Sequence, residues 1–380
     1  MTTTTSPVSR VSRLASLDIV RGAVMVLMAI DHVRVYSGVP AGGPSPGVFF
    51  TRWVTHFCAP AFVFLAGTGA YLHLRKTGDR GAMARYLATR GLMLVVLELT
   101  VIRASWTFGI DYSQFILAGV IWMLGWCMVL LAGLIFLPTS LVGAIGLAVI
   151  IGQSVFGWLP PAAVSQFIYL GEDVKLGTDG PSVTVLYTIV PWIGVMAAGY
   201  AFGSILTREA SIRRRLCLRI GLFATAAFLI LGVIQVIAGP ASENAPPALM
   251  RLLNQQKYPA SQMFLLMTLG PTIALLPFAE RAKGRIGEML AVFGRVPMFY
   301  YLLHIPTIHA VSMLVWFLRD GTAHADWFAT APYVSVPPDQ RWGLPLLYLV
   351  FFVCVVILYF PCRWYAHLKQ RSDSRWLRYI

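Results

Sequence analysis

Apolar runs of about twenty residues recur along this chain, and each is long enough to cross a bilayer as a helix. Only 12% of the residues are charged, against about 25% in an average soluble domain. This pattern predicts an all-α, polytopic integral membrane bundle of about ten transmembrane helices. We place the runs at about 15–37, 48–74, 85–105, 113–136, 140–159, 183–206, 215–238, 260–280, 294–318 and 343–364.

The basic residues test this number of spans. The net charge is +14, and most Lys and Arg residues lie in the two tails and the even-numbered connectors. Basic residues favour the cytoplasmic side of a membrane, so ten spans with both termini cytoplasmic fit best. The same distribution argues against a nucleic-acid partner. We therefore expect a disordered cytoplasmic tail (1–14), a single transmembrane domain (15–366) and a basic cytoplasmic tail (367–380).

The first apolar run, SLDIVRGAVMVLMAIDHVRVYSG, carries ionisable groups at membrane depth. Such groups are costly there and usually face a protein interior or a water-filled cavity. Arg21 and His32 are eleven residues apart, which is about three helical turns and a rise of about 16 Å. They therefore share one face, with Arg21 towards the predicted cytoplasmic side and His32 towards the other. We expect this face to form one wall of an internal site.

His32 is the candidate catalytic residue because an imidazole titrates near neutral pH and can act as a general base or an acyl acceptor. Its alternative role is a structural hydrogen bond to a neighbouring helix. Asp31 is the second catalytic candidate, since it could orient His32. It could equally form an ion pair with Arg34, three residues further along the helix.

Further candidates for binding the donor or the substrate lie on two other predicted spans. The second span begins with TRWVTHFCAPAFVFLAG, and the ninth contains RVPMFYYLLHIPTIH. A structural polar contact is the alternative for His56. The histidine spacing does not match a zinc site, and we expect no metal. The candidates for donor or substrate binding are Arg21, Arg52, Trp53, His56, Tyr300 and His304.

Other features indicate packing or anchoring. Lys257 and Tyr258 lie at a predicted interface, where anchoring of the next helix is the favoured role and substrate contact the alternative. Gly199 and Gly203 are spaced for close helix packing. The five cysteines show no paired spacing, so we interpret them as small core residues.

Several of these segments together resemble the heparan-α-glucosaminide N-acetyltransferase family and its bacterial relatives, within a wider group of transmembrane acyltransferases. The resemblance extends over most of the chain. Arg21 and His32 also resemble the arginine–histidine pair of membrane O-acyltransferases. The segments that carry the family resemblance are SLDIVRG with Asp31-His32, THFCAPAFVFLAG, PWIGVMAAGYAFG (191–203), KYP…TLGP (257–271) and FGRVPMFYYLLHIPTIH (293–309).

The resemblance implies an enzyme that moves an acyl group, in the simplest case acetyl, from cytoplasmic acyl-CoA to a sugar of a glycan or glycolipid across the membrane. It also implies a bacterial inner-membrane location, and it leaves a homodimer open. In the lysosomal enzyme the catalytic histidine lies in the loop after the first helix. Residues 37–50 contain no histidine here, so His32 is the better candidate.

A different class of function explains the intramembrane ionisable groups equally well. Asp31, His32, His56 and His304 could form the proton relay of a transporter or channel. The sequence shows no internal repeat of the kind on which many transporters are built. An acyltransferase therefore remains the favoured hypothesis, with a proton-coupled transporter as its alternative.

Overall fold

A computed structural model describes residues 15–42, 45–113, 115–160, 162–178, 180–239, 245–372, 374 and 377. The predicted N-terminal tail lies outside this part of the chain, as does part of the C-terminal tail. Helices dominate the described residues, and many of them are apolar along most of their length. This confirms the all-α membrane fold.

The long helices follow the predicted runs in order. They are α1 (Ala15–Tyr36), α2 (Pro46–Trp53) continued through η1 (Val54–Phe57) into α3 (Cys58–Thr77), α4 (Arg80–Leu97) continued through the π-helical turn η2 (Glu98–Ile102) into α5 (Arg103–Thr107), α6 (Val120–Leu134), α7 (Thr139–Gly152) with η3 (Gln153–Trp158), α9 (Trp192–Leu206), α10 (Ala210–Ala238), α12 (Gln262–Ala279), α14 (Pro297–Asp320) and α15 (Leu344–Arg371). The short elements are α8 (Ala163–Ser165), η4 (Gln166–Leu170), α11 (Ala248–Leu253), α13 (Arg285–Arg295) and η5 (Ala325–Phe328).

Six helical segments of the described residues are long and apolar enough to cross a membrane. The apolar helices α6 and α9 are shorter. The chain is therefore an integral membrane protein, whereas ten spans and cytoplasmic termini stay predictions. The six segments are Pro46–Thr77, Thr139–Trp158, Ala210–Ala238, Gln262–Ala279, Pro297–Asp320 and Leu344–Arg371.

A small sheet replaces helix at the start of two predicted spans. Strand β1 (Phe115–Ala118) pairs in parallel with β3 (Ser182–Val185), and β2 (Glu172–Lys175) pairs antiparallel on the other side of β3. The predicted runs 113–136 and 183–206 were therefore wrong over their first residues. Strand β1 is apolar, and both β1 and β3 are too short to be told from buried helix by periodicity. The parallel pairing joins residues that are 67 positions apart.

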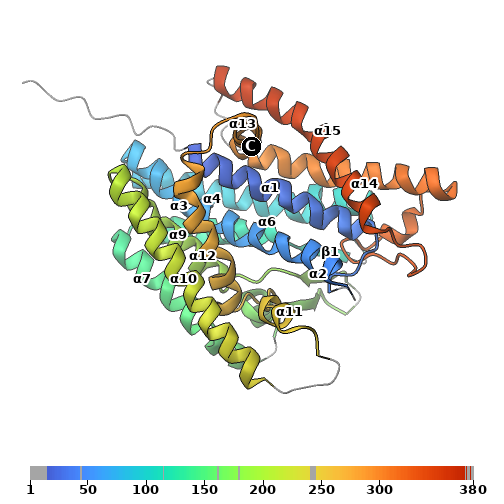
Figure 1. Ribbon diagram of the computed structural model, residues 1–380, viewed down its shortest axis with the longest axis horizontal. Helices are drawn as coiled ribbons and strands as arrows, with labels where there is room; N and C mark the ends of the chain where they lie inside the picture. The colour runs from blue at the N-terminus through green and yellow to red at the C-terminus, as the bar shows by residue number, and fades with distance from the viewer. Residues whose placement is uncertain are drawn as a thin grey trace, which may run out of the picture.

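Helix α1 lies at the centre of the bundle and contacts α3, α12, α13, α14 and α15 (Figure 1). Glycines allow the closest of these contacts. A Cβ atom on Gly22 would come within 1.8 Å of the carbonyl oxygen of Leu290, and one on Gly294 equally close to that of Asp18. The backbones of α1 and α13 thus touch beside Arg21, and a side chain at either glycine would separate them.

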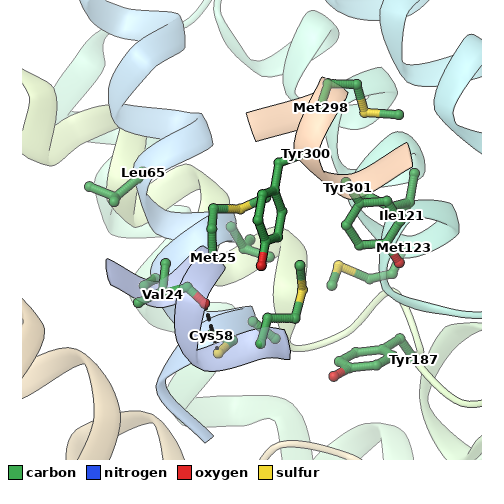
Figure 2. Close-up of a cluster of buried hydrophobic side chains, with 14 of the residues drawn as sticks. Val24, Met25, Cys58, Leu65, Ile121, Met123, Tyr187, Met298, Tyr300 and Tyr301 are labelled. Atoms are coloured by element: carbon green, nitrogen blue, oxygen red, sulfur yellow. Dashed lines mark hydrogen bonds between the residues drawn. The ribbon is translucent and has the colours of Figure 1, made fainter. Parts of the chain in front are cut away.

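Other predicted packing features are confirmed. A Cβ atom on Gly199 would lie 2.1 Å from the carbonyl oxygen of Phe64, so α9 packs directly on α3. All five cysteines are buried and form no disulfide. The Cys58 thiol donates to the Val24 carbonyl over 3.2 Å, within a buried cluster that joins α1 to Tyr300 and Tyr301 of α14 (Figure 2). The interpretation of the cysteines as small core residues is therefore confirmed.

The predicted orientation can be tested by labelling single introduced cysteines. Ile212→Cys, at the start of α10, should stay unlabelled in intact cells by a membrane-impermeant maleimide and become labelled after permeabilisation. Thr178→Cys, in the loop between β2 and β3, should be labelled without permeabilisation. The native cysteines are buried and give a low background. If Ile212→Cys is labelled in intact cells and Thr178→Cys is not, the orientation is the opposite of the predicted one.

Candidate functional site

Two cavities follow one another along α1. The larger, of about 580 Å³, lies at the N-terminal half of the helix, and we call it the basic cavity because five cationic side chains line it. The smaller, of about 300 Å³, contains His32 and is called the histidine cavity. The lining cations of the basic cavity are Arg21, Lys76, Arg90, Arg295 and Lys369.

The two cavities share a wall. Met28, Phe62, Val120 and Tyr301 line both of them, so these side chains have one cavity on one side and the second on the other. The predicted face of α1 is confirmed, because Arg21 faces one cavity and His32 the other, with Met28 between them. The helix therefore connects a basic space with a space that contains an imidazole.

His32 forms a pair with His304 of α14. The His32 Nδ1 and His304 Nε2 atoms are 2.7 Å apart, and the two rings are stacked with their centroids 4.7 Å apart. The Trp106 ring packs edge-on against His32 at 4.8 Å. His304 is fully buried and stacks on the Tyr300 ring. The orientation of His32 is therefore held from two sides.

The hydrogen bonds decide which nitrogen carries each proton. His304 Nδ1 lies 2.7 Å from the Tyr301 carbonyl oxygen, and a carbonyl only accepts, so Nδ1 is the protonated atom. The Nε2 of neutral His304 is then an acceptor, and His32 Nδ1 donates to it. This leaves His32 Nε2 unprotonated, and no described residue hydrogen-bonds it. It is the nitrogen that can take a proton or attack a carbonyl.

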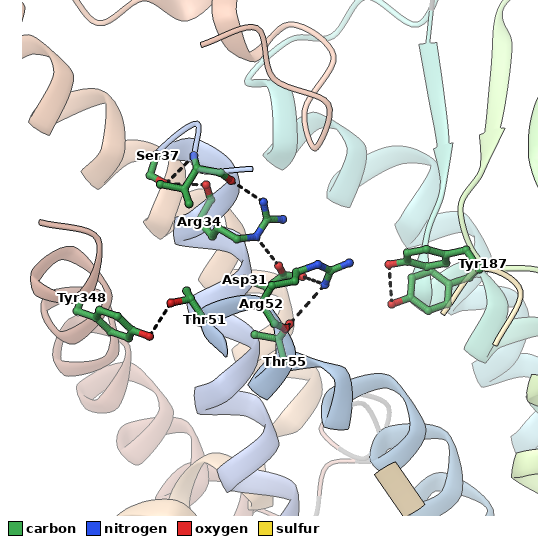
Figure 3. A network of polar contacts seen from close by, with 10 residues as sticks. Asp31, Arg34, Ser37, Thr51, Arg52, Thr55, Tyr187 and Tyr348 are labelled. Carbon is green, nitrogen blue, oxygen red and sulfur yellow. Dashed lines mark hydrogen bonds and ion pairs between the residues drawn. The ribbon is translucent and has the colours of Figure 1, made fainter. Parts of the chain in front are cut away.

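Asp31 belongs to an ion-pair network instead of orienting His32. Its Oδ1 accepts from Arg34 over 3.0 Å and its Oδ2 from Arg52 over 3.1 Å (Figure 3). No hydrogen bond to His32 is formed within the described part of the chain. The predicted pair with Arg34 is confirmed. Arg52 extends from the same carboxylate towards Tyr187 (Figure 3) and lines the histidine cavity.

Four of the predicted binding residues line neither cavity, and one of them is His304, which touches the histidine cavity's His32 from behind. Trp53 donates to the Met267 sulfur over 3.4 Å. His56 packs against Phe264, with its Nδ1 buried and unbonded, and the Tyr300 hydroxyl is likewise buried and unbonded. These residues contact the protein around the site, and their role in binding stays a prediction. The structure pairs His32 with His304 on α14, whereas His56 lies against α12.

Residues 13–253 match the model of the heparan-alpha-glucosaminide N-acetyltransferase catalytic family, which is more than half of the chain. The protein belongs to this family. No curated protein matches the chain. The match confirms the resemblance read from the sequence and identifies a membrane acetyltransferase. It covers α1 to α11 and so includes Arg21, His32 and Arg52, whereas His304 lies beyond it.

A carboxylate that the sequence analysis passed over also lines the histidine cavity of this acetyltransferase. Glu98 is 1% exposed and lies in the π-helical turn η2. Its Oε2 accepts from the backbone N–H groups of Ile121 and Trp122 at the start of α6. An intramembrane carboxylate and a π-turn are both frequent at functional sites. The lone acidic residue in LMLVVLELTVI was the available signal.

Lys257 and Tyr258 also line the histidine cavity, with Tyr187 and Tyr333. The Lys257 ammonium lies over both the Tyr258 and Tyr187 rings, at 5.1 and 5.7 Å from their centroids. Burial alone would raise the pKa of the Tyr258 hydroxyl, but the charges of Lys257 and Arg52 prevail and lower it. The favoured sequence interpretation of Lys257 as an anchor is incomplete, because its side chain reaches the site.

No three His, Cys, Asp or Glu side chains of the described residues lie close enough together to hold a metal ion.

Proposed function

We propose that this protein transfers an acyl group, in the simplest case acetyl, from acyl-CoA in the basic cavity to an acceptor in the histidine cavity. The observation that carries the proposal is the shared wall of the two cavities, with Arg21 on one side and His32 Nε2 on the other. A thioester reaching past this wall would meet the imidazole. The donor and the acceptor would then never need to share a compartment.

The basic cavity suits the donor. Coenzyme A carries several phosphate groups. The five cations that line the basic cavity can supply charge-assisted hydrogen bonds to such groups. Lys76, Arg295 and Lys369 lie near helix ends with predicted cytoplasmic placement, where acyl-CoA is made. The Arg21 side chain is 20% exposed and lies beside Asp18 and the Gly294 carbonyl oxygen. We infer that Arg21 orients the pantetheine arm or a phosphate.

The histidine cavity suits the chemical step. His32 Nε2 takes a proton from the acceptor hydroxyl or amine as the acceptor attacks the thioester carbonyl. The carbon–sulfur bond then breaks, and the proton passes from His32 to the departing thiolate, which restores the neutral imidazole. In the two-step alternative, Nε2 first carries the acyl group itself. Both routes need the tautomer that His304 holds.

The acceptor in this proposal is a sugar of a glycan or glycolipid at the far side of a bacterial inner membrane. The family name supports a sugar acceptor, and the lining tyrosines and Trp106 offer faces for a sugar ring. The direct test is to incubate purified protein with acetyl-CoA and candidate amino sugars, and to follow thiol release together with acetylated product. Thiol release that needs both acceptor and protein would support the proposal.

The proton-relay alternative finds less support in the geometry. A relay needs titratable groups joined in a chain, and His32 and His304 are joined in this way. Asp31, however, binds Arg34 and Arg52, and His56 packs on Phe264 away from them. Uptake of a solute into proteoliposomes with no consumption of acyl donor would favour transport over transfer.

His304 is a positioning residue in this mechanism, and its replacement should have an intermediate effect. His304→Ala removes the acceptor for His32 Nδ1–H, so the base can adopt the wrong tautomer. We expect turnover to fall by roughly 10- to 100-fold, the range seen when hydrogen-bond partners of metal-bound histidines are removed. The affinity for acetyl-CoA should not change. The fall should appear in kcat, with a shifted pH profile.

The control is His56→Ala, which removes a buried imidazole that does not contact His32. An equal loss of kcat in both variants, with unshifted pH profiles, would indicate a packing role for His304.

A further inference from the structure

A buried lysine in the histidine cavity has no anionic partner. Lys257 is 8% exposed, and no carboxylate of the described residues forms an ion pair with it. Its ammonium group lies over the faces of Tyr258 and Tyr187. A buried charge is costly when it is unpaired, and a cation–π contact of about 0.5–2 kcal/mol offsets only part of this cost. The charge of Lys257 therefore calls for a partner from outside the described residues.

The two carboxylates in the lining of the cavity already have other partners. Asp31 is shared between Arg34 and Arg52. Glu98 is bound through Oε2 by the backbone N–H groups at the start of α6. The lining thus holds three cations against two carboxylates. A surplus of positive charge in an enclosed space favours an anionic ligand.

The cavity has the size and surface of a small-ligand site. Its volume of about 300 Å³ is at the lower end of the range for such sites, roughly 300–1,000 Å³. Trp106, Tyr187 and Tyr333 line it and offer apolar faces for a ring. His32 is part of the same wall, so a ligand held by Lys257 shares this small space with the reactive imidazole.

We propose that the acceptor is an acidic sugar whose carboxylate or phosphate group binds the Lys257 ammonium. This rests on the proposed function and adds the chemical class of the acceptor. Its anionic oxygens replace the missing partner of Lys257, and a hydroxyl or amine of the same sugar points to His32 Nε2. The anion fixes the register of the sugar, so only one of its nucleophilic groups reaches the imidazole.

Binding without any donor tests the site separately from the reaction. Glucuronate and glucose 6-phosphate would be compared with glucose by calorimetry on the purified full-length protein. At least one acid should bind about tenfold or more tightly than glucose, because hydrogen bonds to charged groups are the stronger ones. The better acid distinguishes a uronate from a phosphorylated sugar. Equal binding of both acids and glucose would overturn the proposal.

Variants of Lys257 make the test specific. Lys257→Met should abolish the preference for the acid, Lys257→Arg should keep most of it, and Lys175→Met on the exposed strand β2 should keep all of it. A preference that survives in Lys257→Met overturns the proposal. The melting temperature and acetyl-CoA affinity of Lys257→Met should match the wild type. If Lys257→Met loses affinity for acetyl-CoA instead of the preference for the acid, Lys257 binds the acyl donor and the proposal is overturned.

The reaction is then tested separately. Acid binding that depends on Lys257, with no acetyl transfer to any sugar, would overturn the proposed function and leave the anion site standing. Acetyl transfer at equal rates to glucosamine, to glucosamine 6-phosphate and to the uronic counterpart of glucosamine would overturn the acidic acceptor. The proposed transferase activity would then still stand.

Discussion

Replacing His32 by alanine should lower the rate of acyl transfer by about 100-fold or more, the scale expected when a general base is lost. Its Nε2 is the unprotonated nitrogen in the cavity, and no described residue hydrogen-bonds it. The affinity for acetyl-CoA should stay near that of the wild type, because the donor phosphates bind in the other cavity. Steady-state turnover and donor binding would both be measured.

The control for this variant is His367→Ala, an exposed histidine in the last turns of α15. It should keep full activity. A His32→Ala protein that keeps most of its activity would show that the base lies on another helix, with Glu98 as the next candidate in the same cavity. Thermal denaturation of His32→Ala would show separately whether a loss of activity comes from a loss of folding.

Replacing Arg21 by glutamine should weaken acetyl-CoA binding by roughly 10- to 100-fold, the loss expected for a charge-assisted hydrogen bond in a partly buried site. Arg21→Lys should recover part of this affinity, since it restores the charge without the planar guanidinium. The turnover of saturated enzyme should change less than the affinity. Equilibrium binding of acetyl-CoA to purified protein is the measurement.

The control for Arg21 is Arg285→Gln at the start of α13, where the side chain is exposed and lines neither cavity. It should bind acetyl-CoA as tightly as the wild type. Equal losses in the two variants would mean that Arg21 contributes only to the general positive potential of this side. The ion pair with Asp18 makes a check of thermal stability necessary in both Arg21 variants.

Much of the site on α1 was predictable because it depends on a local rule. The helical period places Arg21, Met28 and His32 on one face, and the cost of burying charge predicts that this face lines a cavity. The i,i+3 spacing of Asp31 and Arg34 likewise predicts their ion pair. Such inferences need only the geometry of one helix, which holds in almost any surroundings.

Contacts between distant segments were not predictable in this way. His32 meets His304 across 272 positions, and equal reasons existed to pair it with His56. Strands β1 and β3 were hidden in runs predicted as helix, and their parallel pairing joins residues 67 positions apart. From the sequence, Lys257 was interpreted as an interfacial anchor. Its neighbours in the chain do not reveal that its ammonium group lies over Tyr187, which belongs to a distant segment.

The sequence by itself determined the membrane fold, the family and the helix on which the reactive imidazole lies, because hydrophobic length and helical period are properties of single segments. Only the tertiary structure decided which nitrogen of His32 is free, that Asp31 serves Arg34 and Arg52, and that Lys257 lies unpaired in the same cavity. Each of these depends on which helices pack together, and that packing is set by close backbone contacts such as those of Gly22 and Gly294.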